Sequence, residues 1–116
     1  MTKKELIIKS MDDKLALDIK VINFQNKSPF YDYFIIGTAL NDKMSEAIGR
    51  NVVKTANLNG YKVNKIESSA NGDWTLVDLD DIIVHIFTQQ ARNFYSLEKL
   101  WSDLPIEEIV LWCIKL

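Results

Sequence analysis

In the second half of the chain, hydrophobic and polar residues alternate with the period of a β-strand. Two such runs, 74–79 and 82–87, flank the dipeptide Asp80-Asp81. Aspartate tolerates the backbone geometry of tight turns, so the pattern predicts a hairpin with a two-residue turn. This turn fixes the register and places every second side chain on the same face of the hairpin.

One face of the predicted hairpin is almost wholly apolar and is expected to lie in the core. Its residues are Thr75, Val77, Leu79, Ile82, Val84 and Ile86. The other face is mixed and pairs Trp74 with Phe87, Leu76 with His85, and Asp78 with Ile83. Large aromatic and aliphatic side chains beside one carboxylate are typical of a protein-binding patch. A terminal helix that covers this face would explain the same pattern, and the sequence leaves both interpretations open.

The N-terminal segment predicts a helix followed by a strand. Thr2 and Glu5 have the spacing of a capping box, and the apolar residues that follow predict a short amphipathic helix ending near Lys14. Apolar residues then alternate over 17–22, which predicts a half-buried strand.

A strand, a helix and an edge strand are expected before the hairpin. The apolar run 33–36 predicts a central strand covered on both faces, and the Gly-Thr-Ala segment 37–39 is expected to end it. Asn41 has the position of an N-cap, and Gly60 can end the helix because it accepts left-handed geometry. The weakly alternating run 61–67 then predicts an edge strand, which the helix connects to the central strand as a crossover.

Two short helices are expected after the hairpin, capped by Thr88 and by Ser96. The second helix is expected to place Leu97, Leu100 and Trp101 on one side. The tail 106–116 is compatible with a strand, but its apolar spacing favours a helix. Together these elements predict a single α/β (α+β) domain over 1–116, with a mixed sheet, flanking helices, a core at 15–101 and a tail at 102–116.

Composition narrows the classes of function. The chain has 116 residues, 47% of them hydrophobic, and a net charge of −2. Since lysine and arginine form no run, a surface that follows nucleic-acid phosphates is not expected, and a basic protein partner fits better. A single cysteine, Cys113, permits no internal disulfide. The chain has neither a signal peptide nor a membrane-spanning run, so we expect a cytoplasmic protein.

Catalytic motifs are sparse. No cofactor motif and no cluster with metal-ligand spacing occurs in the sequence. The one enzymatic alternative is Asp78-Leu79-Asp80, whose two acids could share a metal as in nucleotidyltransferases. These enzymes also have a Gly-Ser turn that opens the preceding helix, and the corresponding Gly37-Thr38 lies far away in the sequence. We therefore expect no enzyme, and a lone His85 fits a packing or interface role better than catalysis.

Five segments of the sequence occur together: DYFII at 32–36, DW at 73–74, VD at 77–78, VHIF at 84–87 and RNFYSLEKLW at 92–101. With these segments, the chain resembles the ribosomal silencing factor family (RsfS/Iojap) over roughly residues 15–101. Their order and spacing follow the family pattern. The family pattern differs at 38–43, where many members have Thr-Ser and then arginine, and near Gln90, where an acidic residue is usual. The tail beyond Trp101 is not part of this pattern.

The resemblance implies a fold related to the nucleotidyltransferases without their catalytic residues. It implies binding to the large ribosomal subunit, through its ribosomal protein numbered fourteen, at the face that meets the small subunit. Members thereby block subunit joining and repress translation when nutrients are limiting, and organellar relatives act in ribosome assembly.

The resemblance and the hairpin geometry together define the expected contact residues. Trp74 and Asp78 correspond to family positions at the contact, and the geometry adds Leu76, His85 and Phe87. By the resemblance, three further residues brace the terminal helices against the sheet: Arg92, Phe94 and Tyr95. A homodimer that uses the same patch remains an alternative.

Overall fold

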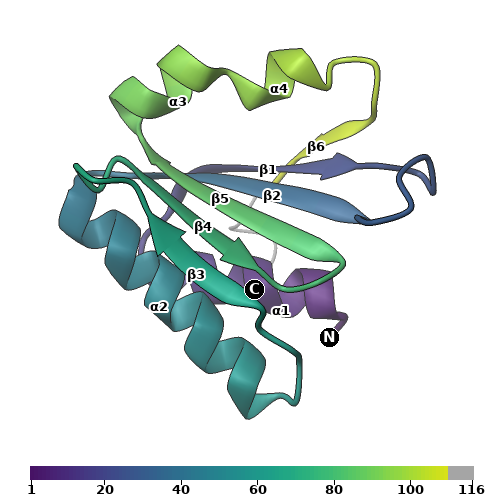
Figure 1. Ribbon diagram of the computed structural model, residues 1–116, viewed down its shortest axis with the longest axis horizontal. Coiled ribbons are helices and arrows are strands. Elements are labelled where there is room, and N and C mark those ends of the chain that lie inside the picture. The colour runs from purple at the N-terminus through teal and green to yellow at the C-terminus, as the bar shows by residue number, and fades with distance from the viewer. Residues whose placement is uncertain (110–116) are drawn as a thin grey trace.

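The computed structural model describes residues 1–109, which form a six-stranded sheet with helices on both faces (Figure 1). The elements are, in chain order, α1 (Lys3–Asp12), β1 (Leu17–Asn23), β2 (Tyr33–Ala39), α2 (Asp42–Leu58), β3 (Lys65–Ser68), β4 (Trp74–Asp78), β5 (Ile82–Thr88), α3 (Gln89–Tyr95), α4 (Leu97–Leu100) and β6 (Ile106–Glu108). This architecture confirms the predicted α+β class. No helix within 1–109 is long and apolar enough to cross a membrane.

The strands lie in the order β3-β4-β5-β2-β1-β6. β2 runs parallel to β5, whereas the other neighbouring pairs run antiparallel, so the sheet is mixed as predicted. α2 connects β2 to β3 as the expected crossover, and β4 and β5 lie between these two strands. Ile35 and Ile36 point to opposite faces of β2 and are both fully buried, which confirms a central strand.

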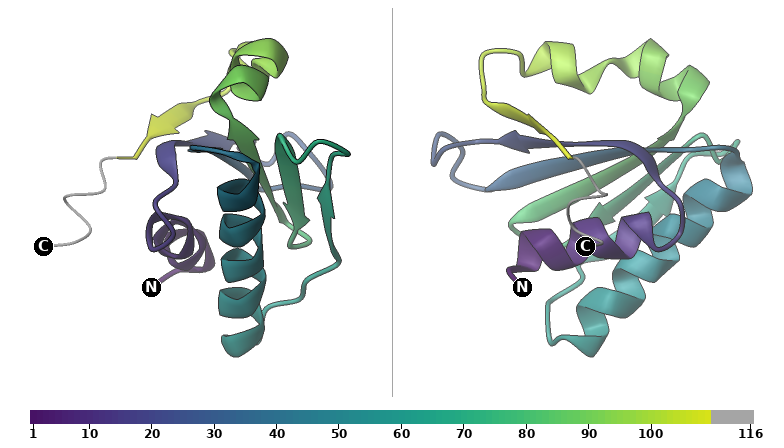
Figure 2. Two further views of the ribbon diagram at one scale, coloured as in Figure 1. Left: turned by 90° about the vertical axis from the view of Figure 1, so that its left-hand side faces the viewer. Right: turned by 180° about the vertical axis from the view of Figure 1, so that it is seen from behind.

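The helices α1 and α2 cover one face of the sheet and enclose the larger part of the core (Figure 2). α1 begins with the predicted capping box, in which the side chains of Thr2 and Glu5 each accept a hydrogen bond from the other residue's amide. The side chain of Asn41 caps α2, also as predicted. Ile7 and Met11 of α1 are fully buried in this core.

Gly37 does not end β2, contrary to the prediction for 37–39. The strand continues to Ala39 and remains paired with β5 over its whole length. A Cβ atom on Gly37 would lie 2.7 Å from Cε of Met11, so glycine here allows α1 to approach the sheet closely. The sequence pattern was misleading because glycine also serves close packing and not only turns.

The helices α3 and α4 cover part of the opposite face, where a second apolar cluster lies. Its buried members are Ile22, Phe24, Ile36, Phe87, Ala91 and Leu104. The buried guanidinium of Arg92 donates to the backbone oxygen of Asp18 and, at 2.8 Å, to Oγ1 of Thr38, and it pairs with Glu98 at 3.5 Å. These contacts tie α3 to β1, β2 and α4, which confirms the predicted bracing role of Arg92.

Details of α3 and α4 differ from the prediction. Thr88 precedes α3 and Ser96 precedes α4, but neither side chain makes a capping hydrogen bond. Ser96 instead adopts a left-handed φ of 48° and ends α3. Leu100 is 70% exposed, so it does not share a buried side of α4 with Leu97 and Trp101.

The two edge strands also differ from the prediction. β3 is the expected edge strand, but it spans Lys65–Ser68 and not 61–67. The weakly favoured helix in the tail is wrong for residues 106–108, which form β6 beside β1, and the Ile109 amide still donates to the Ile19 oxygen at 3.0 Å. The rest of the tail, 110–116, lies outside the described residues.

Candidate functional site

The hairpin of β4 and β5 has the predicted register. Trp74 lies opposite Phe87, Leu76 opposite His85, and Val77 opposite Val84. The amide at position 79 donates to the carbonyl at 82, which closes the two-residue turn. All six residues of the predicted core face are buried, and they pack against α1 and α2.

The opposite face of the hairpin is divided into a covered half and an open half. On β5, Phe87 has 0% exposure and His85 has 5%, because the layer that contains α3 and α4 lies over them. Neither side chain presents a surface to a partner, which corrects the prediction that both make direct contact. On β4, Trp74, Leu76 and Asp78 remain partly exposed, although the Tyr95 ring at the end of α3 packs on Trp74.

An exposed row of rings extends this open half. The Tyr95 ring lies 4.7 Å from the Trp74 ring, and the Phe94 ring lies 5.1 Å from Tyr95 in an edge-on contact. Phe94 is 81% exposed, so it does not brace the helices as predicted. These residues, Trp74, Leu76, Asp78, Phe94 and Tyr95, are called the β4 patch below.

The structure corrects the role predicted for Phe94. The resemblance grouped Phe94 with Arg92 and Tyr95 as bracing residues, but it is Arg92 that donates to Thr38 and Tyr95 whose ring packs on Phe87. The signal that could have found it is the adjacency of the two rings, because successive side chains of an α-helix point about 100° apart and need not face the same side.

Trp74 is held in one orientation by contacts on several sides. Its Nε1 donates a hydrogen bond to Nδ1 of His85 at 3.2 Å. Its ring packs against the rings of Phe87 and Tyr95 at centroid distances of 5.1 and 4.7 Å. A large side chain that is fixed before binding loses less entropy on binding, which suits Trp74 to be an anchor of an interface.

His85 lies beneath Trp74 as a neutral imidazole. Burial lowers its pKa from the ordinary 6.5 to about 4, because the charged form loses its hydration. Nδ1 accepts the bond from Trp74, so the proton of the neutral ring sits on Nε2, which has no hydrogen-bond partner within residues 1–109. His85 therefore supports the patch from inside.

Asp78 contributes negative charge to the patch and also holds the hairpin turn. Its Oδ1 accepts from the Asp80 amide at 2.9 Å and from the Asn64 side chain at 3.2 Å. Asp80 itself has a φ of 79° and lies in the turn, as the two-residue connection requires.

Within residues 1–109, Asp78, Asp80 and Thr38 are engaged in contacts within the fold. Asp78 and Asp80 are joined to each other through the turn, and no group of three or more His, Cys, Asp and Glu side chains in this part could hold a metal ion. Thr38 does not open a helix but lies inside β2, where its hydroxyl accepts a hydrogen bond from Arg92.

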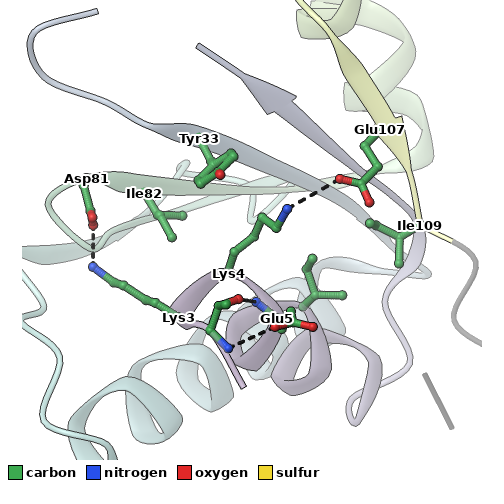
Figure 3. A pocket seen from close by; sticks show the side chains of 10 residues that line it. Lys3, Lys4, Glu5, Tyr33, Asp81, Ile82, Glu107 and Ile109 are labelled. Atoms are coloured by element: carbon green, nitrogen blue, oxygen red, sulfur yellow. Dashed lines mark hydrogen bonds and ion pairs between the residues drawn. The ribbon is translucent and has the colours of Figure 1, made fainter. Parts of the chain in front are cut away.

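A pocket on the other side of the sheet lies between the start of α1 and the strands, but its charges are paired (Figure 3). Lys3 donates to the backbone oxygen of Leu79 at 2.8 Å and to the Asp81 carboxylate, and Lys4 pairs with Glu107 at 3.5 Å. These pairs attach α1 to the hairpin turn and to β6. Their role is therefore structural.

The comparisons with known proteins agree on one family. The family model RsfS, described as "Ribosomal silencing factor during starvation", matches residues 2–111. The ribosomal silencing factor RsfS of Bacillus subtilis (strain 168) is 41% identical over 98 residues, which cover 84% of this chain and 83% of that protein. A crystal structure of a Bacillus halodurans protein has a TM-score of 0.78 and 32% identity, and the match covers 91% of this chain and 96% of the other. The mouse protein named "Mitochondrial assembly of ribosomal large subunit protein 1" is 28% identical over 101 residues, which cover 84% of this chain and 44% of the mouse protein.

The structure is an α+β domain whose mixed sheet is covered on one face by α1 and α2 and partly open on the other, where Trp74 is held in one orientation. Within that class, the chain belongs to the ribosomal silencing factor (RsfS/Iojap) family. The bacterial relatives are named ribosomal silencing factors, and the plant relatives are named Iojap.

Proposed function

We propose that the protein represses translation under nutrient limitation by binding the large ribosomal subunit through the β4 patch. The partner is the ribosomal protein numbered fourteen, at the face that meets the small subunit. The bound domain occupies this face and blocks subunit joining by steric occlusion, with no bond made or broken. The proposal implies that the protein acts in the cytoplasm.

This proposal rests on Trp74, whose side chain is already fixed in one orientation at the centre of the exposed half of this sheet face. Aromatic side chains in well-packed surroundings carry most of the binding energy at protein interfaces. Trp74 lies between Leu76 on its own strand and Tyr95 on α3, and Asp78 adds a carboxylate at one end. An aromatic centre with an acidic border fits a basic ribosomal protein.

The test is co-sedimentation with isolated large subunits. Trp74→Ala is expected to weaken binding by about 2–4 kcal/mol, or roughly thirtyfold to a thousandfold, the range for a central aromatic anchor. The control is Phe30→Ala, because Phe30 is also a large aromatic residue and is 74% exposed, but it lies before β2, at the end of β5 opposite Phe87 and Trp74. If Trp74→Ala melts like the parent and binds like the parent, the patch is not the contact.

Salt dependence separates a protein partner from ribosomal RNA. An apolar contact with one carboxylate beside it should weaken only moderately as salt rises, whereas phosphate contacts release counterions and weaken steeply. Binding that falls steeply with salt and persists on naked ribosomal RNA would contradict a protein partner.

Ribosome assembly is the second candidate function. The printed name of the mouse relative refers to assembly of the large subunit, which supports the same subunit as partner. A subunit-joining assay distinguishes the two functions: silencing predicts that added protein lowers the yield of joined ribosomes from mature subunits, and Trp74→Ala abolishes this effect. A role in assembly alone predicts no effect on mature subunits.

A further inference from the structure

β3 forms an open edge of the sheet. Among residues 1–109 it pairs with β4 on one side only, and all four of its residues are exposed. The Ser69 amide donates to the Trp74 oxygen at 2.8 Å, so in the alternating antiparallel pattern Glu67 faces β4 while Ile66 and Ser68 face outward. The amides and carbonyls of Ile66 and Ser68 therefore point toward solvent in the geometry that a further strand would pair with.

A groove runs between this edge and the second half of α2. Its lining residues are Arg50, Val53, Lys54, Asn57, Leu58 and Ile66. Three of them form an apolar floor, and Leu58 is 76% exposed although it is aliphatic. Gly49 lets α2 approach this part of the sheet, because a Cβ there would lie 2.7 Å from Cγ2 of Thr75 on β4 and 3.1 Å from Cδ1 of Ile66 on β3. The groove is thus bounded by a helix on one side and an unpaired strand edge on the other.

The border of the groove is cationic. Arg50 and Lys54 project from α2, and no carboxylate is among the lining residues. Arg50 pairs with Glu46 at 3.6 Å, but both side chains are largely exposed, so the pair is weak and can be exchanged. Lys65 on the edge strand pairs with Glu67 at 3.5 Å, so the positive charge at the groove comes from α2. The groove of a second copy has no carboxylate to place against Arg50 and Lys54, so an acidic segment of another protein is favoured over a second copy of this chain.

We propose that β3 and this groove bind an extended acidic segment of a partner protein, which adds a strand to the sheet. Backbone hydrogen bonds to Ile66 and Ser68 would hold the segment, and an apolar side chain at every second position would enter the groove. Acidic residues of the segment would meet Arg50 and Lys54. This contact lies on the α2 side of the sheet, whereas the β4 patch lies on the other side, so the two sites can be tested separately.

The experiment selects binders for the full-length protein from a displayed library of short random peptides. We expect enrichment of acidic peptides in which apolar residues alternate. Binding of an enriched synthetic peptide should slow hydrogen exchange at the Ile66 and Ser68 amides by about tenfold or more, and leave the Glu67 amide, which already faces β4, much less changed. Absence of enrichment, or binding without protection of Ile66 and Ser68, would overturn the proposal.

Charge variants provide the control. Lys54→Glu should weaken peptide binding by about tenfold or more, whereas Lys43→Glu makes the same charge change in the first turn of α2, outside the groove, and should not. If both changes weakened binding equally, the peptide would be attracted by the overall charge of the protein and not by the cations that line the groove. Trp74→Ala should leave peptide binding intact, so failure of the ribosome proposal does not decide this one. Protection of Ile66 and Ser68 that grows with protein concentration, without peptide, would identify a second copy as the occupant and overturn the proposal.

Discussion

Nε1 of Trp74 donates a hydrogen bond of 3.2 Å to Nδ1 of His85 across the β4–β5 pair. One of the two residues is partly exposed and the other is 5% exposed. The bond therefore connects the surface of the β4 patch to the interior layer beneath α3. It makes His85 a positioning residue for Trp74, without contact of its own to a partner.

Substitution of His85 tests this positioning role. His85→Phe removes the acceptor, and a donor left without a partner costs about 1–3 kcal/mol. Part of this loss should appear as weaker binding to large subunits, because the Trp74 ring is no longer fixed. His85→Gln can supply an acceptor oxygen and is therefore expected to bind large subunits better than His85→Phe. In a double-mutant cycle, the losses of binding caused by His85→Phe and by Trp74→Ala should not add. Equal binding by both His85 variants would contradict the role.

Stability is expected to depend on pH through His85. Its folded pKa of about 4 lies below the ordinary 6.5, so between these values the unfolded chain binds more protons than the folded chain. The contribution of the neutral ring is therefore fully present above a pH of about 6.5 and is lost as pH falls toward about 4, with a total of about 3 kcal/mol. Urea unfolding of the parent and of His85→Gln at several pH values in this interval measures the effect. If the free energy of unfolding changed with pH by the same slope in both proteins, the role of His85 would be refuted.

Neighbouring substitutions on opposite faces of β4 should have opposite consequences. Val77 is fully buried, so Val77→Asp places an unpaired charge in the core and should unfold the domain or destabilise it by several kcal/mol. Asp78→Arg should leave the domain folded and weaken large-subunit binding by about tenfold or more, because like charges then face a basic partner.

Asp78→Asn is the control for that pair. It retains the oxygen that accepts from the Asp80 amide but removes the charge. Its binding should fall between that of the parent and that of Asp78→Arg. Thermal melting and co-sedimentation on the same variants separate folding from binding, and an Asp78→Arg protein that binds like the parent would place the basic partner elsewhere.

Divalent metal ions should not stabilise the protein. A ligand that binds only the folded state raises its melting temperature by mass action. Because Asp78 and Asp80 are engaged in the hairpin turn, we expect neither magnesium nor manganese to shift the melting curve. A saturable shift that disappears in both Asp78→Asn and Asp80→Asn would instead support the nucleotidyltransferase alternative.

The local sequence pattern was sufficient to predict the structure where the geometry of a short segment depends only on residues within that segment. The hairpin register follows from the two-residue turn at Asp80-Asp81, and the caps at Thr2 and Asn41 follow from side chains that reach amides three residues on. In each case the interacting groups are close in the sequence, so the pattern contains the information.

Only the tertiary structure decided what covers each face. Whether Phe87 and His85 are buried depends on where α3 lies, and α3 is placed by Arg92, whose partners Asp18 and Thr38 lie more than fifty residues earlier in the chain. The same holds for residues 106–108, which become a strand because the edge of β1 is open to them. The sequence by itself determined the hairpin and its two faces. Long-range packing decided which part of the mixed face stays open for a partner. The reason is that burial depends on which distant segments cover the strand, and the alternation of residues within the strand contains no information about those segments.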